Sequence, residues 1–226
     1  NSAMRTPFIV SAAIVLVLLA TTTLLLQRTP VTEPAPLVSA SPTTAAPTLT
    51  PEQTTPTPAP TPAYAEPIAD FRARITKKNY GTYITPQNSP VQPEKFTGYH
   101  TAVDVEYQDI AGDVPVYAIA DGTVRRSGRV SGYGGLLIVE HTGPTSSFFT
   151  VYGHIRPSSL PAVASTVTRG QRIGLLGTGY SSETDNERRH LHFGVITAST
   201  IDVRGYTQKE ADLTSIWRNP LELFAE

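Results

Sequence analysis

The sequence has no cysteine among its 226 residues, which excludes disulfide bonds and thiolate metal ligands. Any metal site would therefore have to use His, Asp or Glu side chains. The sequence also lacks an excess of either charge, with 18 Lys and Arg residues against 19 Asp and Glu residues. A surface that attracts polyanions is not indicated, so nucleic acid is not an expected partner.

Charged residues are also absent from positions 6–27, where the stretch FIVSAAIVLVLLATTTLLL is strongly apolar. A membrane-spanning helix needs about 20 such residues. A cleaved signal peptide is the alternative, although its apolar core usually has only about 7–15 residues and no convincing cleavage site follows. We therefore predict that residues 1–28 comprise a tag remnant ahead of Met4 and a transmembrane anchor or signal segment. The rest of the chain is then expected at the extracytoplasmic face of the cell envelope, anchored in the membrane or, after cleavage, secreted.

Residues 29–67 contain more than half of the 20 prolines, with Thr and Ala between them. Proline at this density interrupts helix and sheet hydrogen bonding and favours extended polyproline II. The segment has too few large apolar residues to offset the entropy lost on ordering the chain. We interpret it as a disordered Pro/Thr-rich stalk that holds a domain away from the membrane.

From residue 68 onward, short runs rich in Val, Ile, Tyr and Phe alternate with Gly- and Pro-containing turns. This pattern predicts a single, mostly β, antiparallel domain over residues 68–226. The runs at 114–120 and 122–128 are expected to form one hairpin. The residues around VTRGQRIGLLG are expected to form another. Two short helices are expected, over 67–77 and 207–217. The predicted strands lie at 114–120, 122–128, 136–141, 148–154, 171–177 and 190–197.

The chemistry is indicated by the five histidines. His190 and His192 flank one leucine, so on a strand they point to the same face. His100 and Asp104 are four residues apart and share a face of an extended segment. With His192 they make a two-imidazole, one-carboxylate set that suits a catalytic zinc ion with one open position. His154 and His190 are then left to move protons, a task that suits the pKa of imidazole.

His141, the fifth histidine, closes the LLIVEH run before a Gly-Pro turn and is interpreted as a hydrogen-bonded structural residue.

The ordered motifs H-x-x-x-D, Y-G-H and H-L-H-F, together with PVYAIADGTV, GYGGLLIVEH and VTRGQRIGLLGTG, resemble the lysostaphin/LytM-type zinc peptidases over about residues 96–224. Many of these enzymes cut peptidoglycan cross-bridges. The resemblance implies a LytM-like fold of the duplicated hybrid or barrel-sandwich type, with a β-sheet groove that binds peptidoglycan peptides. It also implies a Zn2+-dependent endopeptidase in which His100, Asp104 and His192 hold the metal and His154 and His190 are the catalytic pair.

The chain departs from the pattern of this family in two places. Ala102 stands where many relatives have glycine, as in HTGID, and SSETDNERRHLHF replaces the common TGPHLHF. We expect the inserted Arg188 and Arg189 to lie on a solvated loop at the groove edge. The segment 77–96 could cover the groove. No tyrosine can be assigned to oxyanion support, because Tyr99 and Tyr152 are better explained as packing residues.

Two other functions remain open at this stage. The first is a non-hydrolytic cell-wall-binding or hydrolase-activating module of the same fold, which would be expected to lack one of the five groups, whereas all are present. The second is a cupin-like protein or an iron oxygenase with a two-His, one-carboxylate site. Such proteins usually place the first His and carboxylate two residues apart, whereas here they are four apart.

Overall fold

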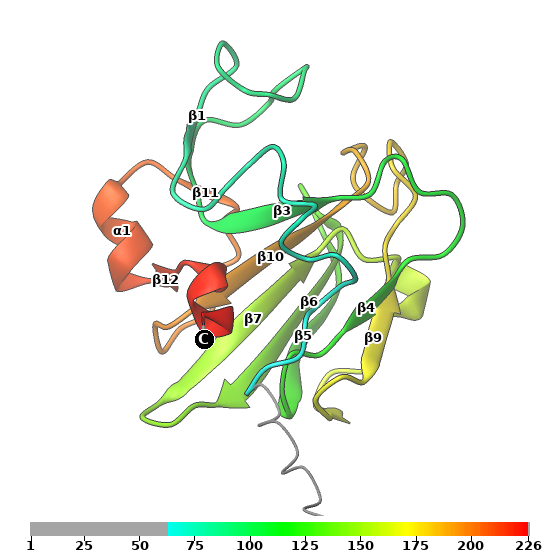
Figure 1. Ribbon diagram of the computed structural model, residues 1–226, viewed down its shortest axis with the longest axis vertical. Coiled ribbons are helices and arrows are strands. Elements are labelled where there is room, and N and C mark those ends of the chain that lie inside the picture. Colours follow the sequence, from blue (N-terminus) through cyan, green and yellow to red (C-terminus); the bar gives the residue numbers. More distant parts are fainter. Residues whose placement is uncertain (1–62, 226) are drawn as a thin grey trace, which may run out of the picture. The chain divides into compact units, whose positions relative to one another are not determined.

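The computed structural model describes residues 63–225 (Figure 1). The predicted tag remnant, the predicted anchor and nearly all of the predicted stalk lie outside these residues. Within 63–225, no helix is both long and apolar enough to cross a bilayer. Tyr64, near the end of the predicted stalk, packs against the hydrophobic core.

The prediction of a mostly β domain is confirmed, because twelve strands and a single α-helix make up the described part of the chain, with two short 3-10 helices. The elements are β1 (Tyr83–Ile84), β2 (Gly98–His100), β3 (Ala102–Glu106), β4 (Pro115–Tyr117), β5 (Gly122–Val130), β6 (Gly134–Thr142), β7 (Ser147–Gly153), η1 (Pro157–Ser159), β8 (Thr166–Val167), β9 (Arg172–Leu175), β10 (His190–Ile196), β11 (Tyr206–Thr207), α1 (Glu210–Ser215), β12 (Trp217–Arg218) and η2 (Pro220–Phe224).

The main sheet is antiparallel and has the strand order β12-β10-β7-β6-β5-β8, with β3 pairing with β10 as well. Strand β10 is central to the site. Strand β7 pairs along one of its edges, and along the other edge β3 pairs with residues 190–194 and β12 with residues 195–196 (Figure 1). Two small sheets, β1-β2-β11 and β4-β9, complete the domain. All pairings given for these sheets are antiparallel, as the sequence pattern predicts.

The two predicted hairpins are wrong. Strand β4 pairs with β9 through Val116 and Gly174, and β5 pairs with β8 through Gly122 and Val167. Each strand of one predicted hairpin therefore pairs with a strand of the other predicted hairpin. This arrangement buries Val116, Val167 and Ile173 in one core cluster, each at most 2% exposed. Burial of apolar area, which sequence spacing does not report, therefore selects the long-range pairing.

The helix predicted over 67–77 is also wrong, since residues 69–74 form turns. Asp70 has a φ of 51°, which an α-helix does not permit. Ile68 and Phe71 on this segment are each 1% exposed in the main core, so tertiary packing outweighs local helical preference. The helix predicted over 207–217 is confirmed in a shorter form as α1.

His141 is structural, as predicted. Its ring is buried between the carbonyl oxygen of Asp121, 2.8 Å from Nδ1, and the hydroxyl of Thr150, 2.7 Å from Nε2. A neutral ring satisfies both partners if Nδ1–H donates to the carbonyl and the hydroxyl donates to Nε2. Burial lowers the pKa of His141, which keeps the ring neutral.

We expect His141→Leu to lower the free energy of unfolding by about 1–3 kcal/mol near neutral pH, because the buried Thr150 hydroxyl and the Asp121 carbonyl lose their partner. The folded pKa lies below the unfolded value, so the unfolded chain binds more protons. The stabilisation by the neutral ring is therefore present above about pH 6.5 and is lost as the pH falls. Urea unfolding of chelator-treated protein at about pH 7.5 and about pH 5.5 should show the gap between wild type and variant shrinking at the lower pH. An equal gap at both values would contradict this account.

Candidate metal centre and active site

Two adjacent strands place the predicted ligands face to face. Strands β3 and β10 are antiparallel, with Asp104 directly opposite His192 and Glu106 opposite His190. Because side chains alternate along a strand, His190 and His192 emerge on the same side as Asp104. His100 is the last residue of β2, and a single residue, Thr101, separates it from β3. The structure thus brings together three residues that are up to 92 positions apart in the chain.

The three atoms that converge at this point have the spacing of a tetrahedral metal site. His100 Nε2 lies 3.3 Å from Asp104 Oδ1 and 3.3 Å from His192 Nδ1. His192 Nδ1 lies 3.1 Å from Asp104 Oδ1. Ligand atoms at about 2.0–2.1 Å from a tetrahedral zinc ion lie about 3.3–3.4 Å from one another. All three residues are buried, which excludes bulk water from competing for the ligand atoms.

The hydrogen bonds of the two imidazoles leave a lone pair on each converging nitrogen. His100 Nδ1 faces the carbonyl oxygen of Asn79 at 3.3 Å, so it carries the proton and Nε2 does not. The hydroxyl of Tyr133 donates to the carbonyl oxygen of Val203 at 2.9 Å and accepts from His192 Nε2 at 3.4 Å. His192 Nδ1 is therefore also unprotonated. In this tautomer two nitrogen lone pairs and a carboxylate oxygen face one another, an arrangement that suits a bound cation.

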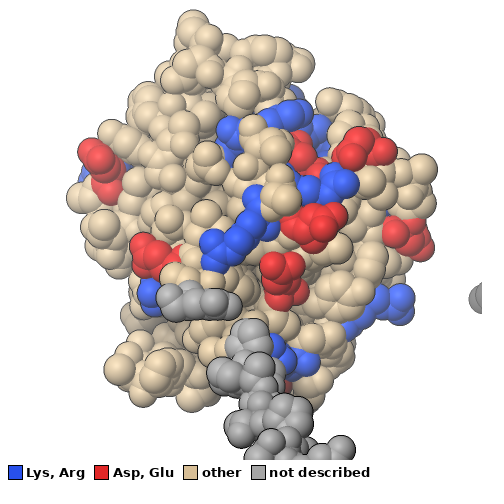
Figure 2. All heavy atoms as spheres, in the orientation of Figure 1, with Lys and Arg blue, Asp and Glu red and all other residues tan. Residues whose placement is uncertain are grey.

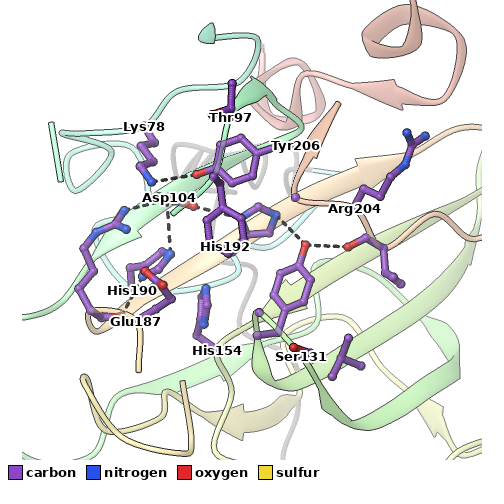
Figure 3. A pocket seen from close by; sticks show the side chains of 17 residues that line it. Lys78, Thr97, Asp104, Ser131, His154, Glu187, His190, His192, Arg204 and Tyr206 are labelled. Atoms are coloured by element: carbon purple, nitrogen blue, oxygen red, sulfur yellow. Dashed lines mark hydrogen bonds and ion pairs between the residues drawn. The ribbon is translucent and has the colours of Figure 1, made fainter. Parts of the chain in front are cut away.

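The other two predicted histidines lie beside this cluster (Figure 3). The ring centroids of His154 and His190 are 4.2 Å apart. His190 Nδ1 donates to the carbonyl oxygen of Arg188 at 2.9 Å, which leaves Nε2 free to accept a proton, 3.4 Å from Asp104 Oδ2. His154 follows directly after β7 in a left-handed conformation with a φ of 63°, and its buried Nδ1 has no hydrogen-bond partner among residues 63–225. Such backbone strain and an unsatisfied polar atom often mark functional sites.

The environment keeps the Asp104 carboxylate charged and the imidazoles of His154, His190 and His192 neutral. Burial favours the neutral form of Asp104, but the attraction of neighbouring cationic groups, of which the guanidinium of Arg188 is the permanent one, outweighs it and holds its pKa well below the usual range. Burial lowers the pKa of His192 and His190, and it lowers that of His154 to about 3. These are the protonation states that metal ligation and proton acceptance both need.

Arg188 is not on a solvated loop, so that prediction is wrong. Its side chain is 2% exposed, and it contacts both Asp104 and Glu106. A sequence signal for this was available: residues 188, 190 and 192 have the same parity, so an extended chain points them to one face. Arg189 is also buried and donates to the carbonyl oxygens of Ile110 and Gly112. It therefore has a structural role, because it holds the loop between β3 and β4.

Tyr133 is a site residue that the sequence interpretation missed. It lies in the turn between β5 and β6, and its buried hydroxyl reaches His192 as described above. The approach depends on Gly153, where an added Cβ would come within 2.5 Å of the Tyr133 ring and 3.1 Å of the His192 Cβ. Tyr152 is a packing residue as predicted, fully buried with its hydroxyl accepting from the Ile119 amide.

A cavity of about 420 Å³ opens over the cluster. Asp104, His154, His190 and His192 form part of its lining (Figure 3). The segment 77–96 contributes Lys78 and Phe96 to the wall of this cavity. The Phe96 ring stacks on Tyr206 with centroids 5.3 Å apart, and Lys78 donates to the Tyr206 hydroxyl at 2.8 Å.

The charged side chains on the face shown in Figure 2 are of both signs and lie close to one another, with uncharged surface around them. This face therefore presents no extended field of one sign.

Comparison with known proteins gives one family match. Residues 98–203 match the model described as Peptidase family M23. No curated protein matches the chain.

Several solved structures are similar to the chain. Helicobacter pylori Csd3 is 22% identical over 66% of this chain and 35% of its own, with a TM-score of 0.42. A zinc-containing peptidase from Vibrio cholerae is 26% identical over 59% of this chain and 36% of its own, with a TM-score of 0.38. Lysostaphin is 25% identical over 66% of this chain and 54% of its own, with a TM-score of 0.41. The match thus spans about a third to a half of these proteins, and the family assignment depends on the family model.

Proposed function

Because residues 98–203 form a domain of peptidase family M23, we propose that the chain is a zinc-dependent endopeptidase that hydrolyses the peptide cross-links of bacterial peptidoglycan. The observation that carries the proposal is the convergence of His100 Nε2, Asp104 Oδ1 and His192 Nδ1 at 3.1–3.3 Å. A set of two nitrogens and one oxygen, with no sulfur, suits zinc in a catalytic rather than a structural site.

A zinc ion held by these three residues would supply a Lewis acid that polarises the scissile carbonyl and acidifies water. The imidazole pair then handles the protons. His190 is held by its Nδ1–H bond to the Arg188 carbonyl, so Nε2 is the atom that takes up or returns a proton. His154 lies against His190 and faces the same cavity, where it can donate to the developing oxyanion or to the leaving amine. The pair thus provides one acceptor and one donor.

The proposed substrate, peptidoglycan, lies outside the cytoplasm, which agrees with the predicted membrane anchor and stalk. We propose that the apolar segment near the N-terminus anchors the protein in the membrane and that the Pro/Thr-rich segment carries the domain to the wall outside the cytoplasm. The composition of residues 1–67 supports this proposal.

Removal of the metal tests the proposal directly. The full chain, purified in a mild detergent, is expected to contain one zinc ion and to release peptides from purified bacterial walls. Chelation should lower the rate by more than about 100-fold, because both the Lewis acid and the acidified water are lost, and added zinc should restore it. Walls with different cross-bridges would identify the scissile bond. A chain that holds one zinc ion but cleaves no wall would instead support the non-hydrolytic wall-binding or hydrolase-activating module.

A further inference from the structure

We infer that Arg188 is a positioning residue for the metal centre, which grips one oxygen of Asp104 and so presents only the other oxygen to His100 and His192. The inference builds on the proposed metal site and extends it to a residue that does not itself bind the ion. It assigns a specific task to Arg188, a buried arginine in the loop that precedes β10.

The contacts of the two Asp104 oxygens are separate. Oδ2 accepts from Arg188 Nη2 at 2.7 Å, whereas Oδ1 faces the two imidazole nitrogens at 3.3 and 3.1 Å. A carboxylate with no partner on either oxygen is free to rotate about its Cβ–Cγ bond. The guanidinium therefore sets the plane of the carboxylate before any ion arrives, which is the task of outer-sphere partners in metal sites.

Glu106 holds the guanidinium in turn. Arg188 Nε lies 3.1 and 3.0 Å from the two oxygens of Glu106, and Arg188 Nη2 lies 2.7 Å from Glu106 Oε1. Asp104 and Glu106 are two residues apart on β3 and point to the same face, so one planar guanidinium reaches both. Lysine, with a point charge on a flexible stem, has no such fork.

Charge balance explains why a cation next to a metal site is tolerated. Arg188 alone would repel the ion, but the carboxylate of Glu106, whose side chain is 10% exposed, balances its charge. The pair is therefore neutral, and Asp104 retains its full negative charge for the metal. The backbone of Arg188 also anchors His190, because its carbonyl oxygen accepts from His190 Nδ1.

The test removes the pair together. Arg188→Met alone would strand two buried carboxylates, so the main variant is the double change Arg188→Met with Glu106→Leu, since replacing a buried ion pair by apolar residues is often tolerated. We expect this full-length variant to fold, with an unchanged circular dichroism spectrum. Its zinc affinity should fall by about 10–100-fold, the usual loss for an outer-sphere partner. The visible spectrum of the cobalt-substituted protein should change, because Asp104 is free to present both oxygens.

Arg188→Lys is the second variant, in case the double variant does not fold. It keeps the charge but loses the fork, so we expect weaker zinc binding and an altered cobalt spectrum here too. Arg189→Met is the matched control, because this neighbouring arginine contacts backbone carbonyls and none of the proposed ligands. It should leave zinc affinity and the cobalt spectrum unchanged even if it lowers stability.

The outcomes separate the inference from the proposal on which it depends. If the wild-type chain binds no zinc, the metal centre itself is wrong. If the wild type binds zinc but the variants at position 188 match its affinity within about threefold and keep its cobalt spectrum, Arg188 is only a structural ion pair and the inference fails.

Discussion

Replacing His192 with alanine is expected to weaken zinc binding by more than about 100-fold and to abolish detectable wall hydrolysis. His192 is the point where the site depends most on the main sheet, because it lies on β10 opposite Asp104 on one side and Gly153 on the other. Its loss removes one of three ligand atoms, and loss of a mere outer-sphere partner already costs about 10–100-fold in affinity. The fold should survive, since His192 is not part of the hydrophobic core clusters that hold the sheet together.

Thermal unfolding with and without zinc measures this effect. Zinc should raise the melting temperature of the wild type, because a ligand that binds only the folded state stabilises it, and it should not raise that of His192→Ala. His141→Leu is the matched control, since it removes a buried histidine that lies outside the cluster. It should lower the melting temperature but keep the zinc-dependent increase. One tightly held zinc ion in His192→Ala would show that the ligand set is wrong.

His190→Ala is expected to keep one zinc ion per chain and to lower wall hydrolysis by about 10²–10⁴-fold, the usual contribution of a positioned acid or base. The basic Nε2 of His190 lies beside the cluster, 3.4 Å from the Asp104 oxygen that faces away from the other two imidazoles. Its removal should therefore affect the rate far more than metal binding. The measurement is the initial rate of peptide release together with the metal content of the same preparation.

His154→Ala and the double variant extend this test. If the two imidazoles act as one proton-transfer unit, the double variant should be little slower than the worse single variant. Activity near the wild-type level in either single variant would remove that histidine from the mechanism. Loss of zinc from either variant would mean that its ring supports the metal instead.

The sequence by itself determined the β class of the domain and the faces to which the site residues point. Alternation along a strand is a local property, so His190 and His192 could be placed on one side without knowledge of any partner strand. The same is true of His100 and Asp104 at their even spacing. The order of the motifs then indicated the family, which the match over residues 98–203 confirms.

Only the tertiary structure decided which segments meet. Pairing of β3 with β10 sets Asp104 against His192, and the exchanged pairing of β4 with β9 and β5 with β8 replaces the predicted hairpins. The burial of Arg188, against the expectation of a solvated loop, follows from the two carboxylates that the register of β3 places in its reach. Strand register and burial depend on the whole apolar surface removed from water, to which residues far apart in the chain contribute together.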